Sequence, residues 1–394
     1  MRDLFREMDK DFNKRERLRL LEEREYEEHA RREARVEKIQ EVAVLQDMTS
    51  LLRQMVQCLP ATQPQYMHSA HTSCRMSSHT VSDSIPPHTL RRLAGEWLAE
   101  DTPNFDPAGV CVGSQEVEAG LLCKTACSVL AGSPFFTAVF TEVGCTVDWI
   151  FHEGTQIAVG VVVFIIPLSG PDAVTLTAVV RGPARGLLLG ERPALNCLAR
   201  ASGIATRCSQ LQAVVKAAGW HGEVAGTRKT TPGFRLVEKY AMLVGGVSMH
   251  RQDLSGMVML KDNHIWASGC ITEAVKAART VCGFSSKIEV ECRSAEEGSQ
   301  AARAGADIVM LDNFQPQDLH VTARALKEEF PSLLIEASGG VTPETLTKYL
   351  SPHVDIVSLG CITQGCPIVD FSLKVQKPVT HSSLQPLCKD SPLH

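Results

Sequence analysis

The chain has 394 residues and a formal net charge of −5, and 44% of its residues are hydrophobic, 22% charged and 5% aromatic. This length allows two domains and a tail, at roughly 100–200 residues per domain. The slightly acidic balance excludes the basic surface that a nucleic-acid-binding protein needs, so we expect no nucleic-acid partner.

The 14 cysteines are scattered and include no Cys-x-x-Cys pair. Zinc sites use such tight pairs and disulfide frameworks belong to short secreted chains, so we interpret the thiols as reduced. The charged N-terminus does not resemble a signal peptide. The longest uncharged apolar run, residues 157–168, has twelve residues, whereas a membrane helix needs about 20. The sequence therefore predicts a cytoplasmic protein with no membrane partner.

The first 60 residues are far more charged than the rest, with 13 positive and 14 negative side chains. From Val36 to Met55, apolar residues recur every three or four positions, which is the period of a helix with a narrow apolar stripe. This pattern predicts a helical or coiled-coil arm over residues 1–60, and an unfolded charged tail is the alternative. Residues 61–85 are rich in Ser, Thr, His, Gln and Pro and are predicted to be a linker.

From about Pro86 the composition becomes that of a packed domain. The sequence predicts a helix over residues 88–98, strand-like stretches over 139–151 and a helix over 182–203. We assign residues 86–200 to one α/β domain.

The second half, residues 201–374, alternates short apolar strands with helices, and residues 375–394 form a tail. Ser294 with Glu297 makes a capping box, and Thr342 followed by Pro343 makes an N-cap with proline at the first helical position. Strands at this spacing form a parallel sheet with right-handed crossovers. A closed or nearly closed β/α barrel fits best, and an open doubly wound sheet is the alternative. The predicted strands are 258–260, 287–290, 307–311, 333–337 and 354–359.

Polar residues follow these strands, at the ends where such barrels place catalytic groups. Lys261, Glu291 and Asp312 follow the first three strands, and the turns Ser338-Gly339-Gly340 and Gly360 follow the last two. Any one of them alone is more typical of a solvated rim charge or a plain turn. Together they indicate a site, because glycine turns bind phosphate through bare N–H groups. Glu291 and Asp312 would suit ribose hydroxyls or a magnesium ion.

The densest group of cations lies upstream, in the segment AGTRKTTPGFR at residues 225–235. Strand alternation would send Arg228 and Lys229 to opposite faces, so both can enter one site only from an irregular backbone, which the flanking glycines permit. His250, Arg251 and Lys261 add further charge. Cations embedded among Thr and Gly are typical of an anion-binding site, where Arg makes two-point contacts and Lys acts as a compact charge.

The motifs GTRKTTPGFR, HRxDL, KDNH, IEVEC, MLDNF, EASGG, GERxALN and SGIAT together resemble the quinolinate phosphoribosyltransferase family, over about residues 86–374. The resemblance implies an α/β fold of type II phosphoribosyltransferases, with an N-terminal α/β sandwich and an incomplete C-terminal α/β barrel, to which the end of the chain can return. It implies the reaction of quinolinate with phosphoribosyl pyrophosphate and magnesium. The products would be nicotinate mononucleotide, carbon dioxide and pyrophosphate, on the de novo route to NAD.

The resemblance also implies roles by motif position. The group holding the two quinolinate carboxylates would be Arg228, His250, Arg251 and Lys261. Contacts to the phosphoribosyl donor and its metal, and the catalytic roles, would fall to Lys229, Glu291 and Asp312, with Thr230 in the substrate-binding set. The 5′-phosphate cradle would be Ser338, Gly339, Gly340 and Gly360. Arg192 matches an arginine that family members pass into the neighbouring subunit's site, so a homodimer or larger homo-oligomer with shared sites is implied.

Two other functions stay open. Lys261 at a strand end could form a Schiff base, as in aldolases, although Asp262 and the need for phosphate contacts argue against it. The chain could instead keep the barrel and act through its arm as a non-catalytic assembly protein. Two departures from the family pattern motivate this reading: residues 1–80 have no counterpart, and an apolar stretch at about 161–177 interrupts what should be a short connection. Exposed, that stretch would be an aggregation-prone strand.

Overall fold

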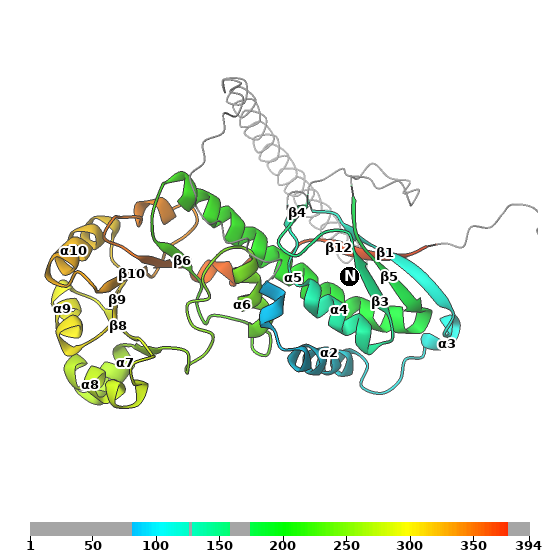
Figure 1. The fold of residues 1–394 in the computed structure, drawn as a ribbon, viewed down its shortest axis with the longest axis horizontal. Helices are drawn as coiled ribbons and strands as arrows, with labels where there is room; N and C mark the ends of the chain where they lie inside the picture. Colours follow the sequence, from blue (N-terminus) through cyan, green and yellow to red (C-terminus); the bar gives the residue numbers. More distant parts are fainter. Residues whose placement is uncertain (1–80, 126–127, 158–173, 377–394) are drawn as a thin grey trace, which may run out of the picture. The chain divides into compact units, whose positions relative to one another are not determined.

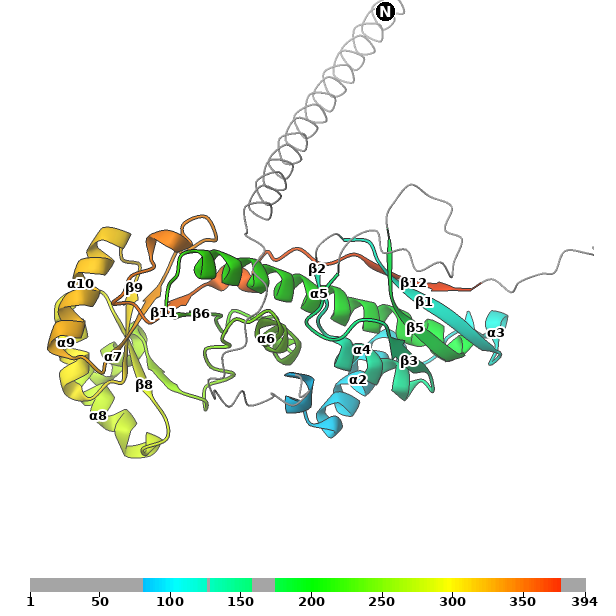
Figure 2. The same ribbon diagram turned by 45° about the horizontal axis from the view of Figure 1, so that its top comes forward.

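The computed structural model describes residues 81–125, 128–157 and 174–376 (Figures 1 and 2). The predicted arm at 1–60, residues 61–80 of the predicted linker, residues 161–173 of the extra stretch and most of the tail lie outside the described residues. The last five linker residues are described and belong to the packed part of the chain: Val81–Ser84 form a 3-10 helix, η1, and Ile85 is buried in the core. None of the described helices is long and apolar enough to cross a membrane.

The N-terminal part of the described chain builds an antiparallel sheet with helices packed against it. After η1 its elements are α2 (Pro87–Asp101), α3 (Gly109–Val112), β1 (Glu116–Cys123), β2 (Ser128–Val129), α4 (Ser133–Glu142), β3 (Thr146–Trp149), β4 (Gln156–Ile157), β5 (Thr175–Pro183) and α5 (Ala184–Ala217). The last strand of the chain, β12 (Phe371–Val375), pairs with β1, so the sheet order is β12-β1-β5-β3. β2 and β4 form a separate antiparallel pair.

The helices predicted over residues 88–98 and 182–203 are confirmed by α2 and α5, although Gly182 and Pro183 end β5 rather than begin the helix. α5 also continues through the domain boundary predicted at 200/201. The strand-like reading of 139–151 is wrong for residues 139–142, which belong to α4. Pro134 suits the first turn of a helix, and the buried aromatic and aliphatic residues of α4 recur at helical spacing: Phe135, Phe136, Val139 and Phe140.

The C-terminal part builds a six-stranded parallel sheet. Its elements are β6 (Glu223–Ala225), α6 (Arg235–Val244), β7 (Val258–Leu260), α7 (Asp262–Ser268), α8 (Ile271–Cys282), β8 (Ile288–Cys292), α9 (Ala295–Ala304), β9 (Ile308–Asp312), α10 (Pro316–Glu329), β10 (Leu334–Ser338), η2 (Leu346–Lys348), β11 (Ile356–Ser358) and η3 (Gly360–Ile362). The strand order is β6-β11-β10-β9-β8-β7, and all neighbours are parallel. In both views α8, α9 and α10 lie on the outer side of β8, β9 and β10 (Figures 1 and 2).

A parallel bridge between Ser248 and Ala225 extends this sheet beyond β6. Among the described residues no pairing joins Ser248 to β7, which leaves the barrel incomplete. The five predicted strands and the incomplete barrel are therefore confirmed.

Of the two predicted helix-start signals, the N-cap at Ser294 is confirmed, but its capping box is only half formed, because Glu297 accepts from Arg293 and not from the Ser294 backbone N–H. Ser294 caps α9, because its hydroxyl accepts from the Glu297 backbone N–H at 3.2 Å. The Glu297 carboxylate accepts from the backbone N–H of Arg293. The Thr342–Pro343 signal is wrong. Thr342 and Thr345 hydrogen-bond to each other in a turn that leads into the short 3-10 helix η2.

Alternation along the parallel strands separates an apolar face from a polar face. The apolar face packs in the core with the covering helices and consists of Ile288, Val290, Cys292, Val309, Leu311, Ile335 and Ala337. The other side of the sheet, inside the incomplete barrel, carries Ile308 and Met310 and the polar residues Glu289, Glu291, Asp312, Glu336 and Ser338. Three neighbouring strands thus direct their polar side chains into one space.

Gly203 offers a test of how α5 and the end of the chain pack together. A Cβ at Gly203 would overlap the backbone carbonyl of Pro367 and lie 3.2 Å from the Ile368 Cα. We expect Gly203→Ala to lower the free energy of unfolding by about 1–3 kcal/mol, because backbone must shift to admit the methyl group. Gly95→Ala in α2, which meets nothing within 4 Å, is the matched control and should raise it by about 0.5–1 kcal/mol. Urea unfolding measures both, and equal effects would contradict the packing argument.

Candidate active site

The chain leaves β6 in an irregular segment that presents the predicted cations. Gly226 is buried, and residues 226–231 form neither helix nor strand, as the alternation argument requires for Arg228 and Lys229. The Arg228 Nε is buried and has no hydrogen-bond partner among the described residues. A buried guanidinium N–H without a partner is a position that an anion would complete.

Lys229 extends from this segment toward the turn after β11. A Cβ at Gly360 would lie 3.3 Å from the Lys229 Cδ, so the lysine stem passes directly over this glycine. The Thr363 hydroxyl donates to the Lys229 carbonyl at 2.6 Å and fixes the backbone there. Thr230 is held on the other side, where its hydroxyl accepts from the Arg235 Nε at 3.0 Å. The structure thus brings Lys229 and Gly360 together.

A buried acid that sequence reasoning missed anchors the same segment. Glu238 of α6 is fully buried and accepts from the Thr231 backbone N–H and hydroxyl at 3.0 and 2.9 Å. Its carboxylate also accepts from Arg200 of α5 at 2.9 and 3.1 Å. The sequence shows only a glutamate within an amphipathic helix, and such a glutamate is usually exposed to solvent, so nothing in it points to a buried anchor.

Acidic residues occupy the ends of β8 and β9. Lys261, just after β7, makes an ion pair with Glu291. Burial, and then the neighbouring charge of Glu291, raise the pKa of Asp312. The two carboxylates are therefore close enough to repel each other, and a cation between them would relieve that repulsion.

The turn after β10 depends on its glycines. Gly339 and Gly340 have φ values of 89° and 66°, in the left-handed region. A Cβ at Gly339 would also lie 2.7 Å from the Asn313 backbone nitrogen. Asn313 in turn donates to Asp312 through its side-chain amide, and the Ser358 hydroxyl donates to that of Ser338 at 2.9 Å. These contacts join the predicted phosphate turn to the end of β9.

His250 contacts two buried acids, Glu289 and Glu336, that sequence reasoning also missed. Its Nε2 lies 2.8 Å from a Glu336 carboxylate oxygen and 3.5 Å from one of Glu289. Burial alone would lower the pKa of His250, but the contacts with the two acids and their negative charges outweigh it and raise the pKa to about 10. The sequence did carry a signal for them. IEVEC and LIEAS each place an acid inside an apolar strand of a parallel sheet, and both faces of such a sheet are usually covered.

Arg251 lies beside this histidine and is mostly buried. Its guanidinium donates to the Met257 carbonyl at 3.1 Å. Burial, and next the nearby positive charge of Arg228, lower the pKa of Arg251. Arg228 and Arg251, which are 23 positions apart in sequence, therefore lie near enough for their charges to interact.

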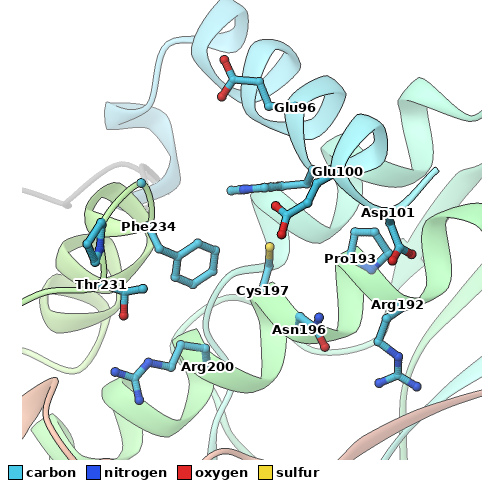
Figure 3. Close-up of a pocket in the computed structure, with 13 residues that line it drawn as sticks. Glu96, Glu100, Asp101, Arg192, Pro193, Asn196, Cys197, Arg200, Thr231 and Phe234 are labelled. Atoms are coloured by element: carbon cyan, nitrogen blue, oxygen red, sulfur yellow. The ribbon is translucent and has the colours of Figure 1, made fainter. Parts of the chain in front are cut away.

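Arg192 is the one predicted site residue that the structure places on α5. It lines a cavity of about 570 Å³, whose walls come from α2, α5 and the turn at Thr231–Phe234. Figure 3 shows Arg192 and Arg200 on the same helix, with Glu100 and Asp101 facing them from α2. None of the strand-end residues predicted for the site lines this cavity.

The two halves of the chain match two family models. Residues 108–202 match the N-terminal domain of quinolinate phosphoribosyl transferase, and residues 204–374 match its C-terminal domain. The chain belongs to the quinolinate phosphoribosyl transferase family. The family resemblance predicted from the motifs is therefore confirmed.

The matched region spans almost the whole length of two relatives in this family. Over 300 residues the chain is 50% identical to nicotinate-nucleotide pyrophosphorylase (carboxylating) of Homo sapiens, covering 76% of this chain and 96% of that protein. It is 47% identical over 306 residues to that of Dictyostelium discoideum, covering 75% and 99%.

Solved structures of the family share the fold. NadC from Streptococcus pyogenes has a TM-score of 0.65 and 32% identity, covering 74% of this chain and 98% of that one. The nicotinate-nucleotide pyrophosphorylase from Francisella tularensis has a TM-score of 0.65 and 29% identity, covering 76% and 100%. These likenesses confirm the predicted fold class of two α/β domains.

His250 should make the stability of this family member depend on pH. Its folded pKa of about 10 lies above the ordinary 6.5, so its stabilising effect is full below pH 6.5 and is lost as pH rises toward 10. The difference in unfolding free energy between wild type and His250→Gln should therefore shrink steadily over this range. Urea unfolding at several pH values measures it, and a difference that stays constant with pH would contradict the charged histidine.

Proposed function

We propose that this chain is a pentosyltransferase that transfers the phosphoribosyl group of phosphoribosyl pyrophosphate to quinolinate. The products are nicotinate mononucleotide, carbon dioxide and pyrophosphate, and the reaction is a step of de novo NAD biosynthesis. The observation that supports this most directly is the buried Arg228 Nε, which has no hydrogen-bond partner among the described residues and belongs to a side chain near enough to Arg251 for their charges to interact. The next residue, Lys229, reaches the turn at Gly360. The names of the curated relatives point to the same reaction.

Quinolinate is a dianion, and its recognition requires several cations on one side of the ring. Arg228, His250 and Arg251 are the groups that we assign to its two carboxylates, since all three are partly or largely withdrawn from water. Lys261 adjoins them from the end of β7. Charge-assisted hydrogen bonds are strongest where water is excluded, so these groups give the site its preference for a dicarboxylate.

The donor needs contacts to its phosphates and ribose. We assign the 5′-phosphate to the turns at Ser338, Gly339, Gly340 and Gly360, because a glycine has no Cβ of its own to keep an anion away from its backbone N–H. Lys229, which passes over Gly360, is placed to neutralise phosphate charge beside that turn. Thr230 and Arg228 adjoin it in the chain.

Glu291 and Asp312 supply the oxygen ligands that magnesium prefers, and their mutual repulsion fits the binding of a cation there. We propose that they hold Mg²⁺ together with the donor and water. When bound, the ion neutralises charge on the departing pyrophosphate.

As pyrophosphate leaves, positive charge develops on the ribose, and the site must hold the pyridine nitrogen against the anomeric carbon. Such alignment contributes about 7–11 kcal/mol in well-oriented systems. Once the nitrogen carries the ribose, the bond to the adjacent carboxylate breaks and carbon dioxide leaves. The electron pair stays on the ring carbon, where the positive ring stabilises it, and this carbon then takes a proton from water. The residues then need only orient and desolvate that carboxylate.

A Schiff-base mechanism at Lys261 is disfavoured. Such a lysine must be a desolvated free amine, whereas Lys261 is ion-paired with Glu291 and its side chain is 45% exposed. No covalent nucleophile is required in the transfer that we propose.

We also propose a cytoplasmic homo-oligomer. The ten described cysteines are all free, which agrees with a reducing compartment. Arg192 lies in a cavity apart from the strand ends, so its expected role requires that it reach the site of a partner subunit.

Arg228 and Lys229 give the direct test of this function. We expect Arg228→Ala and Lys229→Ala to lower kcat/KM for quinolinate and phosphoribosyl pyrophosphate by about 100-fold or more, with little change in melting temperature. Arg91→Ala, at an arginine whose side chain is 73% exposed on α2, is the control and should keep full activity. Nicotinate should not be a substrate. Turnover of nicotinate by the wild type would reject the dicarboxylate assignment.

Mixing two inactive variants tests the shared site. Arg192→Ala and Arg228→Ala each inactivate every site in their own homodimer. In a mixed dimer, one of the two sites combines an intact Arg228 with an intact Arg192 from the partner. An equal, randomly reassorted mixture should recover about one quarter of wild-type activity if sites are shared across a two-fold axis. No recovery, with subunit exchange demonstrated by mass spectrometry, would show that Arg192 acts within its own subunit.

A further inference from the structure

Three buried polar side chains meet below the cations of the site, and the roles assigned so far explain only one of them. We call Glu289, His250 and Glu336 the buried triad. Both glutamates are fully buried and the His250 side chain is 8% exposed. Neither carboxylate oxygen of Glu289 has a hydrogen-bond partner among the described residues, nor does Oε1 of Glu336. Burying two carboxylates so incompletely satisfied is costly, so they need a reason to be there.

The backbone at His250 indicates that the two acids help to hold this residue in place. His250 has a φ of 62°, a conformation that costs energy in a non-glycine residue and persists only when surrounding contacts hold it. Lys239 of α6, itself fully buried, donates to the carbonyl of Met249. The His250 backbone N–H donates to the Ser248 hydroxyl at 3.3 Å. The remaining contacts are those of Nε2, which lies 2.8 Å from Glu336 and 3.5 Å from Glu289.

The charges around the triad favour a positioned imidazolium over a metal ion. The ligand atoms of the triad lie within 4.8 Å of one another, a spacing that a metal would also fit. Positive charge already surrounds the acids, however: Arg251 interacts electrostatically with Glu289. Arg251 in turn interacts with the charges of Lys239 and Arg228. A charged His250 together with Arg251 thus supplies positive charge to the two acids without a further ion.

We propose that Glu336 and Glu289 are positioning residues for quinolinate binding. They hold the His250 ring through Nε2, so that Nδ1 is the nitrogen left to donate to a carboxylate of the substrate beside Arg251. This inference rests on the proposed function and deepens it, because it assigns the orientation of a substrate-binding group to two residues behind it.

The test uses the full-length chain with Glu336→Gln and Glu289→Gln, which keep the shape of each side chain. We expect Glu336→Gln to weaken quinolinate binding, measured by calorimetry without the donor, by about 10-fold or more. KM for quinolinate should rise in parallel, while KM for phosphoribosyl pyrophosphate stays within about twofold, a split that loss of one charge-assisted contact predicts and general damage does not. Glu328→Gln, at a side chain 72% exposed on α10, is the matched control and should change neither constant.

A spectroscopic measurement keeps the proposal testable if Glu336→Gln does not fold, because the wild-type spectrum alone shows whether His250 is charged. In wild-type protein labelled with ¹⁵N-histidine, both ring nitrogens of His250 should be protonated at pH 8, with the signal assigned by its loss in His250→Gln. In Glu336→Gln the same signal should become that of a neutral ring.

Three results would overturn the inference. The first is a folded Glu336→Gln with wild-type affinity for quinolinate, and the second is an equal rise of both KM values. The third is a stoichiometric metal in the wild type, found by elemental analysis and lost in Glu336→Gln. If wild-type protein turns over both substrates and Glu336→Gln behaves like it, only this inference falls. If the wild type neither binds nor consumes quinolinate, the proposed function falls as well.

Discussion

The site depends on holding like charges together. Arg228, Arg235, Arg251 and Lys239 lie near enough to interact, and burial followed by these arginines lowers the pKa of Lys239 to about 8. Unpaired buried cations would destabilise the barrel, so each must have an acid or a carbonyl nearby. Arg251 interacts with the buried acid Glu289, Lys239 donates to the Met249 carbonyl, and the buried Glu238 pairs with Arg200 beside the same segment. These cations can therefore lie together because buried acids and carbonyl groups stand beside them.

Some polar groups near these charges have no hydrogen-bond partner, and others are held rigidly. Glu238 anchors the Thr231 end of the cationic segment, while the Arg228 Nε in the same segment has no partner. A ligand that binds a preorganised donor does not have to reorganise the protein at the moment of reaction. Fixed backbone and free donors in one short segment are the arrangement that a small dianion would complete.

The strand-end chemistry could be predicted because parallel strands repeat one geometry. Alternation and topology together require Glu291, Asp312 and Ser338 to share a face, and both can be read from the sequence. The acids behind them could not be predicted, since a single glutamate in an apolar strand has no periodic signal to say which group it contacts. The helix start predicted at Thr342–Pro343 was wrong for another reason. A short hydrogen-bonded turn between Thr342 and Thr345 forms in place of the helix that the same residues can start.

The departure from the family pattern before β5 bears on whether the chain retains its site. β5 is described from Thr175, within the stretch predicted to be extra, and it pairs with β1 from Thr175↔Cys123 to Pro183↔Glu116, with one irregularity between Leu121 and Leu122. It also pairs with β3 along four residues. The pairing with β3, and the pairing with β1 from Ala178 onward, therefore lie after the stretch predicted to be extra. α5 begins directly from the paired strand. Since α5 bears both Arg192 and the Arg200 that contacts Glu238, the elements that shape the site are assembled downstream of the unusual segment, which favours a catalytic protein over an assembly module that has lost its site.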